Sequence, residues 1–289
     1  MAASKENGIV PWTIVGSVMG VAAATAALLV ATPVQAQGRL DARYIVTLAG
    51  VPIGKGAWVV DIAEDRFTAA ASGATAGLLR VLSSGQGSGA SRGSIVSGNP
   101  VPASFAASIT ADKKTEEIRM TLGSGDVKDF VITPPVKPDP NRIPVTEAHR
   151  HGVSDPMTGS LVRVPGTGNP VGPAACERTA SIFDGRMRYN LRFSYKRMEH
   201  VKAEKGYEGP AVVCAVYFVP VAGYVPSRVA IKYLTKQRDM EVWLAPVAAT
   251  RVLVPFRLSI PTPIGLGIMQ ATQFVSVAQP PRATNTRLP

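Results

Sequence analysis

The sequence contains few of the residue types that usually carry out chemistry. It has two cysteines and three histidines among 289 residues. It contains neither a glycine-rich loop that ends in a lysine nor a G-x-S-x-G elbow. The adjacent carboxylates Glu64–Asp65 and Glu116–Glu117 lie beside expected turns, and neighbouring strand residues point to opposite faces. These absences disfavour a phosphate-binding loop, a serine nucleophile and a paired general acid and base, so we predict no catalytic residues and no cofactor.

Charge is also scarce at the start of the chain, where Lys5 and Glu6 are the only charged residues before Arg39. The stretch 12–32 is apolar and is followed by small residues, a pattern typical of a secretory signal peptide over 1–36. The alternative is an uncleaved N-terminal anchor helix, because 14–31 carries no charge and reaches the minimum spanning length. In both cases we expect the rest of the chain to be exported, most simply to a bacterial periplasm.

The net charge is +11, and the two charges in the expected signal peptide cancel, so the exported part keeps this value. A basic chain attracts nucleic acid, anionic lipid head groups or acidic glycans. Because an exported protein rarely meets nucleic acid, we expect a membrane surface or glycan rather than nucleic acid as partner. The alternative is that the positive charge is only a solvated surface.

A strictly alternating stretch lies in the middle of the chain. The period of two is typical of a half-buried β-strand. The apolar members are Met187, Tyr189, Leu191, Phe193 and Tyr195, and the basic members are Arg186, Arg188, Arg192 and Lys196. If the apolar members face the inside of a curved sheet, they are candidates to line a hydrophobic ligand cavity, with a basic face outside. The alternative is that they fill the core.

Apolar runs separated by turn residues predict strands along most of the chain. We expect them at 42–49, 57–62, 66–75, 83–98, 103–110, 117–122, 127–133, 187–196, 211–219, 240–245, 251–259 and 267–277. Short helices are expected at 155–164 and 226–237, and five prolines within 134–144 mark a connection between two halves. The predicted fold class is mainly β: an antiparallel, closed or half-open barrel-like sheet with two short helices. It forms a single domain over 37–277, followed by a disordered tail over 278–289.

Two cysteines, Cys176 and Cys214, remain after export, and an oxidising compartment favours one disulfide between them. A regular ladder would place Cys176 near Phe193 and Cys214 near Glu199, too far apart for the bond. The disulfide therefore requires Cys176 to leave the ladder, which Gly172-Pro173 just before it permits.

His149 and His151 are the weak candidates for a metal site. On an extended chain, residues two apart face the same way, and Glu147 and Asp155 are near in sequence. Zinc sites need three or four ligands and a supporting shell. Two histidines in a proline-rich loop do not supply these, so we predict no metal.

Two stretches resemble a known family. Residues 155–163, which begin with Asp155 and include Thr158, are similar to the helical motif of domain-of-unknown-function family 3108. Residues 241–246 and 251–255 with Gly265-Leu266-Gly267 are similar to its closing segments. Thr158 stands where the family commonly has serine, and alanine replaces the acidic residue before Arg251. The resemblance implies an exported, mostly antiparallel β domain, and it brings no agreed activity and no catalytic residues.

These features together predict a non-enzymatic periplasmic protein that binds or handles a hydrophobic or lipidic component of the cell envelope. The first alternative is a scaffolding protein with a filled core that acts through contacts with another envelope protein. The second is a hydrolase acting on envelope glycan or lipid.

Overall fold

One antiparallel sheet makes up most of the protein. The computed structural model describes residues 37–76 and 85–280, which contain fifteen strands. The strands are β1 (Gly38–Leu48), β2 (Val51–Ile62), β3 (Arg66–Thr75), β4 (Gly85–Val96), β5 (Asn99–Ala111), β6 (Lys114–Gly123), β7 (Asp126–Thr133), β8 (Val162–Arg163), β9 (Thr179–Phe183), β10 (Arg188–Lys202), β11 (Lys205–Gly206), β12 (Glu208–Ala222), β13 (Glu241–Pro246), β14 (Val252–Thr262) and β15 (Gly265–Ala278). The expected signal peptide and residues 281–289 of the expected tail lie outside the described residues.

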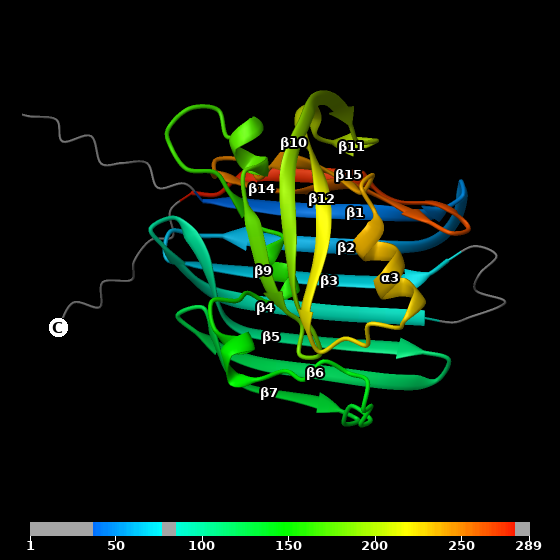
Figure 1. The fold of residues 1–289 in the computed structure, drawn as a ribbon. Coiled ribbons are helices and arrows are strands. Elements are labelled where there is room, and N and C mark those ends of the chain that lie inside the picture. The colour runs from blue at the N-terminus through cyan, green and yellow to red at the C-terminus, as the bar shows by residue number, and fades with distance from the viewer. Residues whose placement is uncertain (1–36, 77–84, 281–289) are drawn as a thin grey trace, which may run out of the picture. The chain divides into compact units, whose positions relative to one another are not determined.

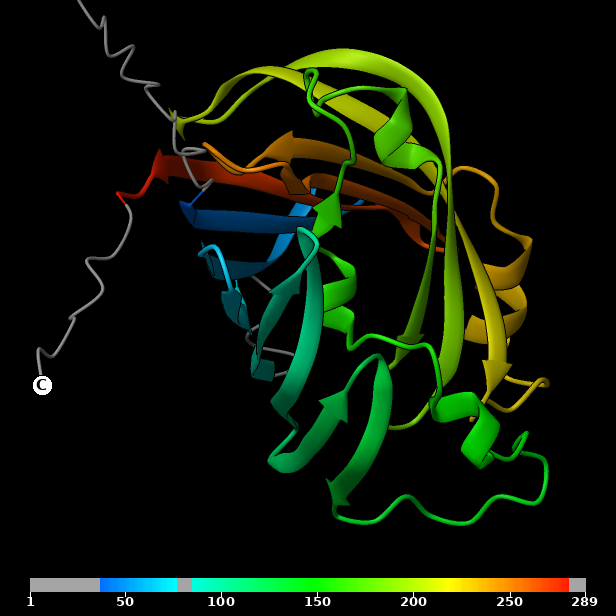
Figure 2. The same ribbon diagram turned by 90° about the vertical axis from the view of Figure 1, so that its left-hand side faces the viewer.

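The strand order leaves the sheet with two ends. It runs β7-β6-β5-β4-β3-β2-β1-β15-β14-β13-β12-β10-β9, while β8 pairs with β14 and β11 pairs with β15. Neighbours along this path are antiparallel, whereas the short β11 runs parallel to β15. The sheet bends so far that β10 and β12 cross in front of β1–β4 (Figure 1), and the side view shows the resulting curvature (Figure 2). The predicted mainly β, barrel-like architecture is confirmed, and of the two forms it is the half-open one.

Tight turns connect most of the first seven strands. Ala49-Gly50, Ser97-Gly98, Asp112-Lys113 and Ser124-Gly125 all have positive φ. Consecutive left-handed residues form the hairpin turn whose twist matches that of the flanking strands. The serine- and glycine-rich stretch that precedes the Ser97-Gly98 turn forms strand β4, as predicted.

The helices are shorter than predicted. They are α2 (Pro156–Gly159), α3 (Val229–Lys236) and the 3-10 turns η1 (Glu147–Arg150) and η2 (Pro173–Cys176). The first ends at Gly159 rather than at Val164, because Val162–Arg163 pair with β14 instead. The second begins at Val229 rather than at Pro226. Among the described residues, no helix combines the length and the apolar composition needed to cross a bilayer.

Three clusters of buried side chains stabilise the sheet. The first includes Leu40, Tyr44, Trp58, Val60, Phe67, Val213, Trp243, Val254, Phe256 and Phe274. The second includes Val162, Val171, Cys176, Val212, Cys214, Val242, Leu244 and Leu253. The third includes Phe105, Ile118, Met120, Leu122, Val127, Val153 and Phe183. Each large apolar side chain that leaves water contributes about 1.5–3 kcal/mol to folding, so the packed part of the sheet is well supported.

The predicted disulfide is confirmed. Cys176 and Cys214 are bonded with their Cα atoms 5.4 Å apart. Cys176 lies in η2, before β9 begins, so it has left the ladder as the bond requires. The predicted register of the other cysteine was wrong: Cys214 pairs with Tyr195 rather than with Glu199. The chain reverses direction at the hairpin tip around β11, earlier than predicted, so that Lys202 pairs with Glu208. A bulge after Tyr195 then shifts the register by one more residue.

Candidate functional site

The face of the sheet that packs against α2, here called the inner face, is filled at one end. Leu40 lies beside Val60, and Phe105 lies beside Met120, and all four side chains are buried. Met157 of α2 packs against the clusters that contain them. This end of the inner face therefore has no room for a ligand.

Asp155 fixes α2 to this face through a buried hydrogen-bond network. Its carboxylate accepts hydrogen bonds from Ser91 Oγ of β4 at 3.0 Å and from Thr158 Oγ1 at 2.6 Å. It also accepts from the backbone N–H groups of Met157 and Thr158 at 2.9 and 3.0 Å, which caps the helix. Burial raises the pKa of Asp155, and these hydrogen bonds oppose the rise without cancelling it. A carboxylate engaged in four such bonds holds a segment in place.

Toward the other end of the strands, glycines replace the large residues of the inner face. One cross-strand row consists of Tyr44, Gly56, Gly73, Gly87 and Ile109. The next row consists of Val46, Gly54, Thr75, Gly85 and Ala111. We call Gly54, Gly56, Gly73, Gly85 and Gly87 the glycine floor.

No second layer made of described residues lies close above the glycine floor. A Cβ on any of its members would meet, within 4 Å, only atoms of the adjacent strands among the described residues. For Gly73 the only such atom is a carbonyl oxygen at 3.5 Å. A Cβ on Gly89, by contrast, would meet Met157 Sδ of α2 at 3.4 Å. Glycine weakens a strand and often marks a place where another group approaches closely, so the described residues leave space above the floor on the inner face.

Four members of the glycine floor, Gly54, Gly73, Gly85 and Gly87, form the base of an apolar groove of about 360 Å³. Val46, Ile53 and Ile109 contribute its apolar walls. Ile109 remains 51 % exposed even though it lies on the inner face. Ligand sites are mostly concave and apolar, and a groove with this lining suits a hydrocarbon chain rather than a charged molecule.

The five predicted lining residues of the central strand lie elsewhere. Leu191 and Phe193 pack against the second core cluster. Tyr189 contacts an aromatic ring of β12 at 5.4 Å between centroids, and burial raises its pKa. Tyr195 is 41 % exposed, and Met187 precedes β10. None of the five lines the glycine-floor groove, and of the five only Phe193 lines the polar hollow described below.

The four basic residues predicted to form one face have different partners. Arg186 lies in the turn before β10 and pairs with Glu116 of β6. Arg188 donates a hydrogen bond to the carbonyl of Tyr189 at 2.7 Å. Lys196 pairs with a glutamate of β13. Arg186 and Lys196 thus connect elements that are distant in sequence, Arg188 bonds within its own strand, and Arg192 is exposed.

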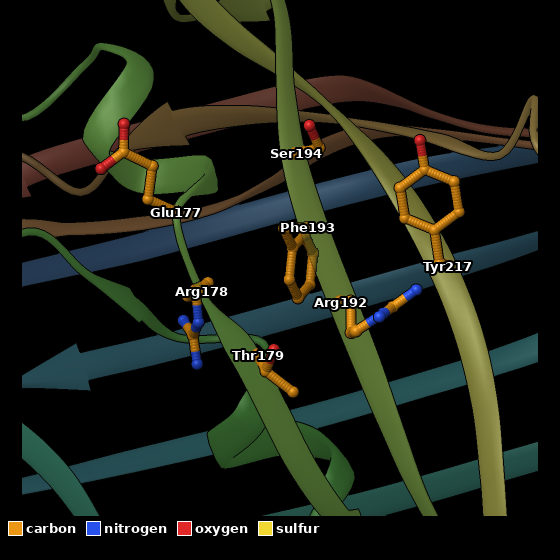
Figure 3. A pocket seen from close by; sticks show the side chains of 7 residues that line it. All are labelled: Glu177, Arg178, Thr179, Arg192, Phe193, Ser194 and Tyr217. Atoms are coloured by element: carbon orange, nitrogen blue, oxygen red, sulfur yellow. The ribbon is translucent and has the colours of Figure 1, made fainter.

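Arg192 borders a second, polar hollow of about 530 Å³ between β9, β10 and β12 (Figure 3). It is lined by Glu177, Arg178, Thr179, Arg192, Phe193, Ser194 and Tyr217. The guanidinium of Arg178 lies 5.8 Å from the ring centroid of Phe193, and burial lowers its pKa. The lining includes one carboxylate and neither histidine nor cysteine. This hollow therefore offers hydrogen-bond donors but no pair of groups suited to acid–base catalysis.

The two histidines lie near η1 and serve local contacts. His149 Nδ1 accepts a hydrogen bond from the Thr146 N–H at 3.0 Å. His151 Nδ1 lies 3.2 Å from a carboxylate oxygen of Asp126. Within residues 37–76 and 85–280, no group of three or more His, Cys, Asp or Glu side chains is placed to hold a metal ion. Asp155 is buried in its own network, so the structure does not bring these three side chains together.

Arg251, the arginine of the C-terminal motif, holds a loop against β14. Its guanidinium donates to the carbonyl oxygens of Val164, Pro165 and Gly168 at 2.9, 2.8 and 2.6 Å. Together with the network of Asp155, these contacts show that the motif residues that carry the resemblance stabilise the fold. The groove went unnoticed in the sequence, although the alternation of Gly85, Gly87 and Gly89 along one strand was a visible signal.

Comparison with known proteins identifies a family and a similar solved structure. The family model described as "Protein of unknown function (DUF3108)" matches residues 43–272. Among solved structures, a beta-barrel-like protein of domain of unknown function DUF1849 from Brucella abortus is similar, with a TM-score of 0.44 and 8 % sequence identity. The similarity covers 83 % of this chain and 97 % of that chain. A comparison with curated proteins found no match.

Proposed function

Because this chain belongs to the DUF3108 family, whose function is unknown, we propose its function from its site: it is an exported, non-enzymatic protein that binds the acyl chain of an envelope lipid. The acyl chain lies along the glycine floor, between Val46 and Ile109. The observation that carries this proposal is the run of glycines across β2, β3 and β4 on an inner face that is otherwise filled.

The chemistry of the groove supports a hydrocarbon ligand. Each methylene that leaves water contributes about 0.8 kcal/mol, so six methylenes contribute roughly 5 kcal/mol. The walls supply apolar contacts through Val46, Ile53 and Ile109. The glycines, which have no side chain, let the acyl chain of the ligand approach the protein backbone closely.

Two features support export. The first 36 residues carry the composition of a secretory signal peptide. Cys176 and Cys214 are both completely buried and bonded to each other. Stable structural disulfides are typical of oxidising compartments such as the periplasm.

We propose that the protein is not an enzyme, because its buried carboxylate on the inner face is already engaged in structural hydrogen bonds. Asp155 is the most buried carboxylate of the inner face, and its oxygens are occupied by the four hydrogen bonds that hold α2. General acid–base catalysis needs a group within hydrogen-bond reach of a substrate. Asp155 lies under α2 and does not line the groove.

The test is lipid binding by the mature protein, purified without detergent from its own compartment. Native mass spectrometry should reveal an adduct with the mass of a lipid, and the stripped protein should bind a soluble fluorescent fatty acid. Gly73→Leu should abolish this binding because the new side chain fills the groove. Ala70→Leu is the matched control, since Ala70 is exposed on the opposite face of β3.

If the Gly73→Leu variant binds the fatty acid as tightly as the wild type does, the glycine floor is not the binding site. A protein that carries no adduct and binds no fatty acid would favour the scaffolding alternative. That alternative has some support of its own, because Leu191 and Phe193 pack against the second core cluster.

A further inference from the structure

One end of the glycine-floor groove lies among three described turns of the sheet. Ile53, Thr75 and Ala111 line the groove and are the strand residues nearest to this end. The β1–β2, β5–β6 and β14–β15 turns all lie at the same end, because the strands between them alternate in direction (Figure 1). We call Val51, Lys113, Lys114, Ile264 and Leu266, which lie in or beside these turns, the rim.

The apolar part of the rim is strongly exposed. Val51 is 47 %, Ile264 is 73 % and Leu266 is 42 % exposed. The N–H of Ala49 in the β1–β2 turn donates to the carbonyl of Leu266 at 3.0 Å, so these two turns adjoin. Clustered apolar side chains on a surface mark an interaction site more often than isolated ones do.

Two lysines lie at the rim beside the exposed apolar side chains. The β5–β6 turn presents Lys113 and Lys114, with Asp112 as the one acidic residue in the three rim turns. The turns at the opposite end carry mixed charge, because Asp65 pairs with Arg66 and Asp126 pairs with Lys128. Basic and apolar side chains therefore lie together at the rim.

Helix α3 adds the same composition on this side of the molecule (Figure 1). None of its residues is fully buried, and Val229 at its start is 77 % exposed. Lys232 and Lys236 are exposed along it. A short helix with apolar residues and lysines at the surface is typical of segments that contact a membrane interface.

We propose that the rim docks on an anionic phospholipid bilayer. Val51, Ile264 and Leu266 enter the head-group region, and Lys113 and Lys114 lie over lipid phosphates. This places the adjoining end of the groove against the acyl chains that it would accept. The inference deepens the proposed function and rests on it, because it gives the groove its source of ligand. An acidic protein partner would match the lysines but not the exposed apolar side chains of Val51, Ile264 and Leu266.

The experiment is co-sedimentation of the mature protein with vesicles of phosphatidylcholine alone or of phosphatidylcholine mixed with phosphatidylglycerol. The mixed vesicles should bind the protein at least about tenfold more tightly, since each lysine near an anionic surface contributes favourably. The variant K113Q/K114Q should lose most of that preference. Ile264→Asp should lower binding to the mixed vesicles by about tenfold or more, because one apolar side chain no longer enters the interface.

Val96→Asp is the matched control, because Val96 is 54 % exposed and lies beside the β4–β5 turn at the opposite end of the sheet. It should bind vesicles like the wild type. Absence of binding to mixed vesicles, or equal loss in the Val96→Asp and Ile264→Asp variants, would overturn the proposal. Binding of a soluble fatty acid is measured separately: its loss in Gly73→Leu concerns the groove, whereas the rim variants should retain it. Failure of docking and failure of ligand binding are thus distinguishable.

Discussion

Ser91 of β4 and Asp155 at the start of α2 are joined by a buried hydrogen bond of 3.0 Å. The bond links the sheet directly to the segment that fills one end of its inner face. It also marks the boundary between the filled and the open part of that face. Gly89, two residues before Ser91 on β4, lies under α2, whereas Gly87 does not. The position of α2 therefore decides how much of the inner face remains open as a groove.

Replacing Asp155 should therefore destabilise the protein markedly. Asp155→Ala leaves two backbone N–H groups and two hydroxyls without their acceptor. We expect the free energy of unfolding to fall by about 2–4 kcal/mol. Asp155→Asn keeps an acceptor for the helix cap and should cost less than Asp155→Ala. Urea denaturation measures both, and equal costs would mean that the cap matters little.

The same residue should give stability a characteristic pH dependence. The pKa of Asp155 is raised in the folded state, so folding favours its protonated form. Its contribution is fully present below the unfolded pKa of about 3.9 and is lost as pH rises through the folded pKa. The difference in unfolding free energy between wild type and Asp155→Asn should therefore shift in favour of the variant as pH rises from acidic to neutral. A difference that is independent of pH would contradict this assignment.

The disulfide should make a large contribution to stability. It closes a loop with a sequence separation of 38 residues between two buried sulfurs. Loop-closure entropy alone predicts a loss of about 3–4 kcal/mol when the bond is absent. Denaturation of C176A/C214A should show this loss, and reductant should lower the wild type to the same level. Reductant should leave the variant unchanged, which controls for other effects of the reagent.

A larger side chain on the glycine floor should raise the stability of the protein and weaken its lipid binding. A Cβ on Gly87 meets its nearest atom at 3.6 Å, an ordinary contact. Because valine suits a strand better than glycine, Gly87→Val should raise the free energy of unfolding by about 0.5–1 kcal/mol. It should nevertheless weaken lipid binding.

Gly93 of the same strand provides the contrast. A Cβ there would lie 2.0 Å from the carbonyl oxygen of Val101, so Gly93→Ala should lower the free energy of unfolding by about 1–3 kcal/mol. Thermal denaturation compares the two variants. Destabilisation by Gly87→Val of the same size as by Gly93→Ala would mean that the floor glycines serve the fold and not a ligand.

Strands were easier to predict from the sequence than their arrangement. Alternation and turn residues located β10 and β12, whereas β4, with its small side chains, was predicted from the strands expected on both sides of it. The helix expected from Asp155 to Val164 was too long, because Val162–Arg163 pair with β14, which lies far along the chain. Local propensity cannot anticipate a partner of that kind.

The groove shows a second limit. Gly54, Gly73 and Gly87 belong to three different strands, and only the register of two hairpins places them together. A slip of one residue in either hairpin would turn a glycine to the other face. Individual glycines were visible in the sequence, but their common face depends on pairings that a single sequence does not determine.

Glu241 should dominate the acid sensitivity of the region around β13. Its carboxylate accepts two hydrogen bonds from the Arg197 guanidinium, at 2.9 and 3.1 Å, and pairs with Lys196. The hydrogen bonds from Arg197 are the largest cause that lowers the pKa of Glu241 to about 2. For an acid with a lowered folded pKa, the stabilisation is present above the unfolded pKa of about 4.3 and is lost as pH falls through the folded value.

Glu241→Gln should therefore cost about 1–2 kcal/mol at neutral pH. In the wild type, stability should decline between pH 4.3 and pH 2 because the Glu241 carboxylate becomes protonated and its ion pairs are lost. The variant has no carboxylate at this position, so this part of the decline should be smaller. Glu117→Gln is the matched control, because its partner Arg119 lies on the surface with 75 % of its side chain exposed. An exposed pair contributes about 0–1 kcal/mol, so this variant should keep the wild-type pH profile. If both variants retain the same acid transition, the transition is set by other carboxylates, and the ion pair of Glu241 with Arg197 contributes no more than an ordinary surface contact.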